Sequence, residues 1–177
     1  MRVLGISGSL RQGSYNSRLL RVAAELLPPG AELEVWHALG DIPPFDADAE
    51  HSPPVAVTAL KRAIAEADAV LIATPEYNHS IPGVLKNALD WVSRPIAANP
   101  MRGKPALVIG ASTGMFGAVW AQAETRKVLG ALGARVLDEE LPVATTPDGL
   151  DDHELQARLA DLLRDLVASG AALMRAA

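Results

Sequence analysis

The chain has 177 residues, of which 49% are apolar and 21% are charged, and its mean hydropathy is +0.15. This length and composition predict a single globular domain over residues 1–177 with a continuous core, and they exclude a disordered chain. A formal net charge of −5 and a pI near 5.3 argue against general affinity for nucleic acids or anionic membranes, both of which attract basic surfaces.

Short apolar runs alternate with segments of helical period along the whole chain. Runs such as AVLIA and ALVIG are apolar without alternation, which is typical of strands buried on both faces of a parallel sheet. Five strand–helix pairs in sequence predict a doubly wound α/β domain with right-handed crossovers. In chain order, we expect a strand at 2–7, a helix near 17–27, a strand at 32–36, a helix at 55–67, a strand at 69–74, a helix at 83–92, a strand at 106–111, a helix at 118–132, a strand at 135–137 and a helix at 152–173.

Two segments between these elements have a pattern of their own. Proline-rich stretches at 42–45 and 52–54 frame a long connection between the second strand and the second helix. A connection of that length is usually functional or packs as a lid. The last helix has a leucine stripe at helical spacing, and the preceding DGLDD at 148–152 offers acidic caps that suit the helix dipole. The stripe consists of Leu155, Leu159, Leu162, Leu163 and Leu166.

The absence of cysteine removes disulfides, thiolate nucleophiles, iron–sulfur clusters and cysteine-ligated zinc. The start, MRVLGISGSL, contains one basic residue and too few apolar residues for a signal peptide. The longest apolar runs, such as the one at 69–73, are far shorter than a membrane span. We therefore expect a cytoplasmic protein without membrane or nucleic-acid partners.

Ligands of open α/β sheets bind beyond the carboxyl ends of the strands, where the strand order reverses. The informative residues are therefore those that follow the first, third and fourth strands. In this chain these three loops read GSLRQGSYNS at 8–17, PEYNHSIPG at 75–83 and STGMFG at 112–117. All three are rich in small or polar residues, so we expect a site between them.

Two roles fit the first loop. Its glycines and backbone amides, placed before a helix, suit an anion site, to which Arg11 would add a charge-assisted hydrogen bond. Ser9, Ser14, Asn16 and Ser17 offer further polar groups. Neither the Walker pattern nor the Rossmann glycine spacing is present. The other role is an ordinary capped turn, with Ser14 or Asn16 as the helix cap.

The second and third loops also leave two roles open. The second carries planar polar groups that suit the edge of a heteroaromatic ring, but Glu76 also fits a solvated charge, Tyr77 a packing residue and His79 an exposed histidine. No other histidine or acid stands at metal-ligand spacing from His79, so we expect no metal site. The third loop places small residues at a strand end, as either a ligand wall or a flexible turn.

Three segments resemble one known family. GSLRQGSYN after the first strand and PEYNHSIPGVLKNALDW after the third look like the signature segments of the NADPH-dependent FMN reductase family, which includes chromate and quinone reductases. STGMFGAVWAQAETRKVL is similar to a third, weaker segment, although the family usually has Gly-Gly where this chain has Gly117–Ala118 and an arginine near Trp120. The resemblance covers essentially the whole chain. It implies a flavodoxin-like, doubly wound, five-stranded parallel sheet of order 2-1-3-4-5 with helices on both faces.

The resemblance also implies a site for non-covalent FMN, with NADPH or NADH as co-substrate. No residue is expected to act as a nucleophile or acid–base catalyst, because the flavin carries the chemistry. Ser9, Arg11, Ser14, Asn16 and Ser17 would hold the phosphate; Pro75, Glu76, Tyr77 and Asn78 would line the ribityl chain and ring system; Ser112, Thr113 and Gly114 would approach the other side of the ring.

The implied function is an FMN-dependent NAD(P)H oxidoreductase that passes a hydride from NADPH through flavin N5 to a small acceptor, such as a quinone, free flavin, chromate, an azo or a nitro compound. The family further implies a homodimer or homotetramer with sites near the subunit interfaces. Two alternatives have the same fold. One is a flavodoxin-type electron carrier without direct nicotinamide oxidation, and the other is a binding module without flavin.

Overall fold

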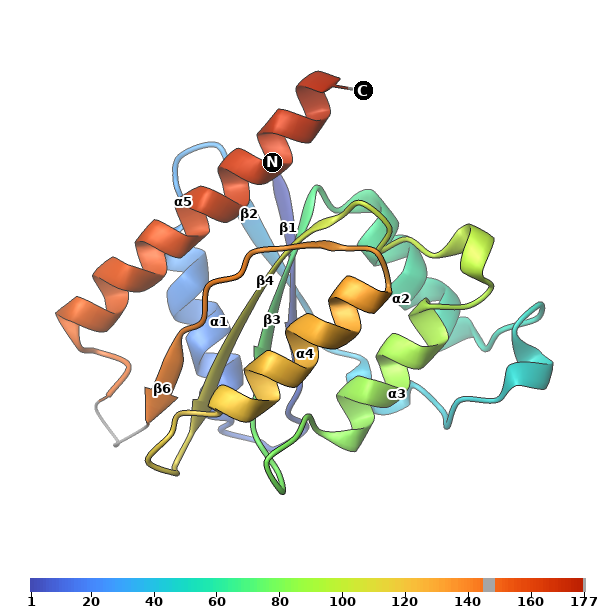
Figure 1. Cartoon of the computed structure of the whole chain (residues 1–177), viewed down its shortest axis with the longest axis horizontal. Helices are drawn as coiled ribbons and strands as arrows, with labels where there is room; N and C mark the ends of the chain where they lie inside the picture. Colours follow the sequence, from blue (N-terminus) through green and yellow to red (C-terminus); the bar gives the residue numbers. More distant parts are fainter. Residues whose placement is uncertain (145–148, 177) are drawn as a thin grey trace.

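The computed structural model describes residues 1–144 and 149–176, which form a parallel sheet with helices on both faces (Figure 1). The strands are β1 (Arg2–Ser7), β2 (Glu32–Trp36), β3 (Ala69–Thr74), β4 (Pro105–Ser112), β5 (Arg135–Val136) and β6 (Pro142–Ala144). The helices are α1 (Tyr15–Leu26), α2 (Val55–Glu66), α3 (Gly83–Val92), α4 (Val119–Ala131) and α5 (His153–Ala176). Short 3-10 turns lie at Leu39–Asp41, Ala47–Ala49 and Ile96–Ala98.

The sheet confirms the predicted flavodoxin-like topology. Its strand order is β2-β1-β3-β4-β5, and every pair of neighbours is parallel. The register pairs Ser7 with Ala73 and Thr74 with Gly110, so β1, β3 and β4 end at the same edge. All residues of β3 are buried, as its continuous apolar sequence predicts for a strand covered on both faces.

The edge of the sheet beside β4 differs from the prediction, which placed a single strand there at 135–137. Among the described residues, two short strands share this position: β5 pairs with the start of β4, and β6 pairs with its end. The intervening chain carries Asp138, Glu139 and Glu140, and three consecutive carboxylates are costly to bury in a sheet. The charged stretch therefore leaves the sheet, and the chain returns to it at Pro142.

The helices divide into two layers, each with its own apolar core. Figure 1 shows α1 beside α5 and, across the sheet, α2, α3 and α4. The leucine stripe of α5 packs into the core of its layer, with Leu159 and Leu163 fully buried. The predicted acidic cap is confirmed at Asp152, whose Oδ1 accepts the N–H of Leu155 at 2.8 Å. Asp148, the other end of the predicted acidic stretch, lies outside the described residues.

The long connection between β2 and α2 is fixed to α3. The carbonyl oxygen of Pro43 accepts hydrogen bonds from Trp91 Nε1 and from Asn87 Nδ2, each at 2.8 Å. Asn87 Oδ1 in turn accepts a hydrogen bond from the N–H of Phe45 at 2.8 Å. The rings of Phe45 and Trp91 meet edge to face, with centroids 5.0 Å apart. These contacts hold the connection against the α3 side of the sheet.

No helix in the described part of the chain is long and apolar enough to cross a bilayer.

Candidate functional site

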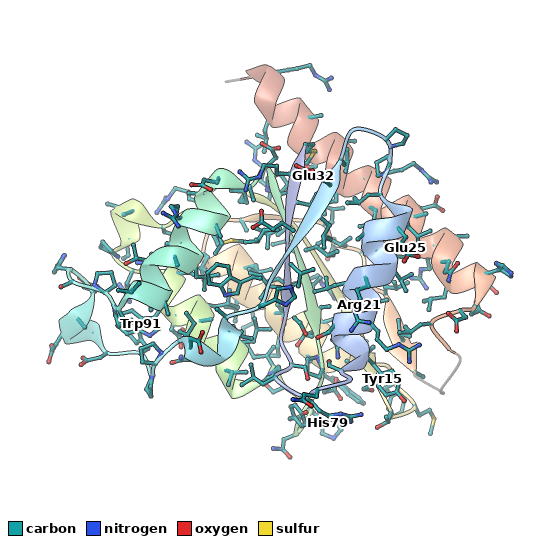
Figure 2. All side chains as sticks on the ribbon, turned by 180° about the vertical axis from the view of Figure 1, so that it is seen from behind. Tyr15, Arg21, Glu25, Glu32, His79 and Trp91 are labelled. Carbon is teal, nitrogen blue, oxygen red and sulfur yellow. The ribbon has the colours of Figure 1, made fainter. Side chains whose placement is uncertain are left out.

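A cavity of about 160 Å³ opens at the carboxyl ends of β1, β3 and β4. This is the point where the strand order reverses, because β2 lies on one side of β1 and β3 lies on the other. Its walls are the loops after these three strands and the first turn of α1. Figure 2 shows Tyr15, which lines the cavity, and His79 at the same end of the molecule, opposite Glu32 at the start of β2.

Most of the predicted site residues line this cavity, namely Ser9, Arg11, Ser14, Asn16, Pro75, Glu76, Tyr77, Ser112 and Thr113. The remaining three, Ser17, Asn78 and Gly114, do not line it. Tyr15 and Ala111 line it as well, although the sequence analysis assigned neither of them. Tyr15 lies between the predicted residues Ser14 and Asn16, and Ala111 directly precedes the predicted Ser112. This adjacency in the sequence is the signal that could have identified them. No residue of the connection at 37–55 is part of this lining.

Ser14 is the cap of α1, one of the two roles predicted for the first loop. Its Oγ accepts the N–H groups of Asn16 at 3.2 Å and Ser17 at 3.4 Å. A hydroxyl that accepts through its lone pairs still has its own proton to donate. Capping the helix and binding an anion are therefore compatible at Ser14.

Asn16 joins two elements that are distant in the sequence. Its Nδ2 donates to the carbonyl of Ala111 and its Oδ1 accepts the N–H of Ala111, both at 2.9 Å and across 95 residues of chain. The side chain is buried, so these bonds fix the start of α1 to the end of β4. Ser17 likewise bonds within the protein, through its Oγ to Ser7 Oγ at 3.0 Å. The contacts predicted between these two residues and a phosphate stay predictions.

Arg11 lines the cavity and has no acidic partner among the described residues. Within residues 1–144 and 149–176, no carboxylate forms an ion pair with its guanidinium. It lies close to the N-terminus of α1, where the positive end of the helix dipole also favours a negative ligand. In a chain of net charge −5, an unpaired arginine at a helix N-terminus is the arrangement expected of an anion site.

The loop after β3 forms a tight turn at the rim of the cavity. The backbones of Tyr77 and Ser80 exchange two hydrogen bonds, at 3.1 and 3.0 Å. Between them, Asn78 and His79 both have positive φ angles of 53° and 59°, as the central residues of type I′ turns do. Asparagine tolerates this conformation better than most residues. The turn therefore has a defined backbone shape.

The side chains of this loop separate the roles left open by the sequence. Glu76 is not a solvated surface charge, because its side chain is 13% exposed and its carboxylate accepts the N–H groups of Trp120 and Ala121. His79 is exposed, and its ring meets that of Trp120 edge to face at 4.5 Å. In the described residues, no group of three His, Asp or Glu side chains is arranged to hold a metal ion.

Exposed apolar side chains also lie on the three loops and on the first turn of α4, and one of them, Tyr77, lines the cavity itself. The ring of Phe116 meets that of Trp120 at 5.0 Å, and both residues are substantially exposed. Solvent-exposed aromatic groups beside a polar cavity are typical of surfaces that bind a ligand or another protein. This apolar rim consists of Leu10, Tyr77, Met115, Phe116 and Trp120.

Comparisons with known proteins agree with this geometry. The sequence profile of the NADPH-dependent FMN reductase family matches residues 1–148. The chain is 46% identical over 164 residues to an NAD(P)H-dependent FMN reductase of Pseudomonas aeruginosa, covering 91% of this chain and 85% of that protein. It is 40% identical over 141 residues to a quinone reductase of Escherichia coli, covering 78% of this chain and 74% of the relative.

Solved structures give the same result. FerB, a flavoenzyme NAD(P)H:(acceptor) oxidoreductase from Paracoccus denitrificans, superposes with a TM-score of 0.85 at 36% identity, and the match covers 96% of each chain. A flavodoxin variant from Pseudomonas aeruginosa superposes with a TM-score of 0.60 at 23% identity, over 93% of this chain and 99% of the flavodoxin. The second likeness concerns the fold alone.

Proposed function

This chain belongs to the NADPH-dependent FMN reductase family, and on that premise we propose that it is an FMN-dependent oxidoreductase which oxidises NAD(P)H and reduces a small acceptor. The relatives support both halves of the reaction, because one is named for FMN reduction and another for quinone reduction. Quinones are therefore the first acceptors to test. When bound, FMN would supply the chemistry that links hydride donation by the nicotinamide to reduction of the acceptor.

The cavity at the strand ends is the observation that carries this proposal. Cations, hydroxyl donors and helix N-termini all favour binding of a phosphate monoester, and the cavity brings the three together. Arg11 has no carboxylate partner there among the described residues, and the Ser14 hydroxyl keeps a proton to donate. The residues present thus fit the phosphate end of FMN.

Each wall of the cavity has its own part in holding FMN. The loop after β1 would bind the phosphate, the loop after β3 would line the ribityl chain and ring through its backbone, and the loop after β4 would approach the other side of the ring. The residues are those of the sequence analysis: Ser9, Arg11, Ser14, Asn16 and Ser17; Pro75, Glu76, Tyr77 and Asn78; and Ser112, Thr113 and Gly114.

The size of the cavity suits a site that two substrates must reach in turn. Pockets that enclose a whole ligand measure roughly 300–1,000 Å³, whereas this cavity measures about 160 Å³. A cavity of this size would enclose part of a molecule such as FMN and leave the remainder accessible. Nicotinamide and acceptor both need that access, and the apolar rim offers planar surfaces beside it.

A turnover assay tests this function. The protein loaded with FMN should oxidise NADPH or NADH rapidly when a benzoquinone is supplied, with one nicotinamide consumed for each quinone reduced by two electrons. A flavodoxin-type carrier would bind FMN but oxidise the nicotinamide only slowly. Slow oxidation with every quinone, flavin, chromate, azo and nitro acceptor would contradict the proposal.

We also propose that the protein works in the cytoplasm as a homodimer or homotetramer. Exposed apolar side chains support the assembly, because a second copy that packs against part of the rim would bury aromatic groups that water now contacts and leave the rest of the rim open to substrates. Light scattering at micromolar concentration tests the assembly, and a monomer at all concentrations would contradict it.

A further inference from the structure

Helix α4 has no cap from its own sequence. The residue at its N-cap position is Ala118, which has a left-handed backbone (φ 63°) and whose side chain accepts no hydrogen bond. The first N–H groups of a helix have no intrahelical acceptor and need other partners. Val119 N–H donates to the carbonyl of Phe116 at 3.2 Å, and Gln122 N–H donates to that of Ala118 at 3.0 Å. The N–H groups of the two intervening residues need an acceptor from elsewhere.

Glu76 supplies that acceptor from the loop after β3. Its Oε2 accepts the N–H of Trp120 at 3.0 Å and the N–H of Ala121 at 3.1 Å, although these residues lie 44 and 45 positions further along the chain. Hydrogen bonds to a carboxylate are stronger than those between neutral groups, especially when the carboxylate is mostly buried. The negative charge also lies at the positive end of the α4 dipole.

Ring contacts join the same two segments a second time. The ring of His79, three residues after Glu76, meets the ring of Trp120 at 4.5 Å, and Trp120 in turn meets Phe116 at 5.0 Å. His79 Nδ1 lies 3.7 Å from Glu76 Oε1. The loop after β3 and the start of α4 are thus attached through the backbone and through side chains.

We propose that Glu76 is a positioning residue, whose carboxylate caps α4 from a distance and thereby fixes the loop after β3 relative to the loop after β4. These loops are two walls of the cavity, since Glu76 and Tyr77 line one side and Ser112 and Thr113 line the other. The third wall, formed by the loop after β1 and the start of α1, is attached to β4 by the two hydrogen bonds between Asn16 and Ala111. The cavity therefore has its shape before a ligand enters, which reduces the ordering cost of binding. The part of this inference that concerns FMN rests on the proposed function.

Amide exchange in the flavin-free protein tests the cap directly. In Glu76→Ala, we expect Trp120 and Ala121 to exchange about 3- to 30-fold faster, the factor that corresponds to loss of an N-cap. Glu76→Gln keeps an acceptor oxygen at the same reach and should restore most of the protection. Glu76→Asp is one methylene shorter and should resemble Glu76→Ala. Glu124→Ala, which removes a half-exposed acid paired with Lys127 on the same helix, is the matched control and should leave both amides unchanged.

Unchanged exchange of Trp120 and Ala121 in Glu76→Ala, or equally fast exchange in Glu124→Ala, would overturn the cap. If Glu76→Ala does not fold, the comparison of Glu76→Gln with Glu76→Asp decides, and equal exchange in the two would overturn it. FMN affinity tests the positioning role: Kd should rise about 3- to 30-fold in Glu76→Ala and less in Glu76→Gln. An unchanged Kd would contradict the positioning role and leave Glu76 with the role of a helix cap alone. A wild-type protein that binds no FMN would contradict the proposed function, while the exchange data would still test the cap.

Discussion

At the scale of single residues, Arg11 makes the strongest contact that we expect with a phosphate. A hydrogen bond to a charged group contributes about 1.5–3 kcal/mol, so Arg11→Ala should weaken FMN binding by about 10- to 100-fold. The fold should not change, because Arg11 is exposed on a loop. Titration of flavin fluorescence measures the effect. Arg21→Ala, an exposed residue of α1 that does not line the cavity, is the matched control (Figure 2). Equal affinities in the two variants would remove Arg11 from the site.

Gly117 is the residue at which the backbone itself limits substitution. Its φ is +57°, and an added Cβ would lie 2.5 Å from the backbone nitrogen of Val143. Left-handed strain costs roughly 1–2 kcal/mol and overpacking typically about 1–3 kcal/mol, so Gly117→Ala should lower the free energy of unfolding by about 2–5 kcal/mol. Urea denaturation measures this loss. Gly30 also has a positive φ but has open space around it, so Gly30→Ala should lower the free energy of unfolding by the left-handed strain alone. Equal losses in the two variants would contradict the clash at Gly117.

The sequence alone predicts site residues whose role follows from their place at a strand end. Arg11 and Ser14 follow the first strand, and the structure places both at the cavity. Roles that depend on distant partners were not predictable in this way. Asn16 binds Ala111, and Glu76 binds the start of α4; local patterns contain no information about contacts 95 or 44 residues away.

At the scale of elements, the connection at 37–55 is a packed segment of the α3 layer. Asn87→Ala would leave the Phe45 N–H without its acceptor, at a cost of about 1–3 kcal/mol, and should speed exchange of that amide. FMN affinity should change less than twofold, because the connection lines no part of the cavity. Lys86→Ala removes only an i,i+4 ion pair with Asp90 on the same helix and should cost under about 0.5 kcal/mol. A large loss of FMN affinity in Asn87→Ala alone would show that the connection does shape the site.

The boundaries of helices and strands agree with those predicted from the sequence where an element is uniformly buried. They differ where charged residues interrupt an apolar segment. The strand at 69–74 and the helix at 83–92 have their predicted bounds, since each is an apolar pattern that ends at a proline or polar residue. The segment near 135–144 does not. Its acidic stretch divides one strand position into β5 and β6, which pair with β4 through backbone groups that the side-chain pattern does not reveal.

At the scale of the whole molecule, alternation of strands and helices predicts a doubly wound sheet but not its order. The order came from the resemblance, and the parallel pairing of β2, β1, β3, β4 and β5 confirms it. That order determines where the site lies, because it brings three loops to one point at the sheet edge. Each loop alone fits an ordinary turn. Together they form a cavity with an arginine that has no carboxylate partner in the described part of the chain, the capped start of α1 and, from the loop after β3, the carboxylate that caps α4.

The most direct test of this protein as an FMN-dependent oxidoreductase is its visible spectrum under anaerobic conditions. The purified protein is reconstituted with FMN, separated from free flavin and mixed with a small excess of NADPH. We predict that yellow absorption remains with the protein after separation and is bleached completely when NADPH is added. Absorption that stays with the protein but does not bleach with NADPH or NADH would contradict the enzyme and favour an electron carrier. A colourless protein would contradict the flavin site itself.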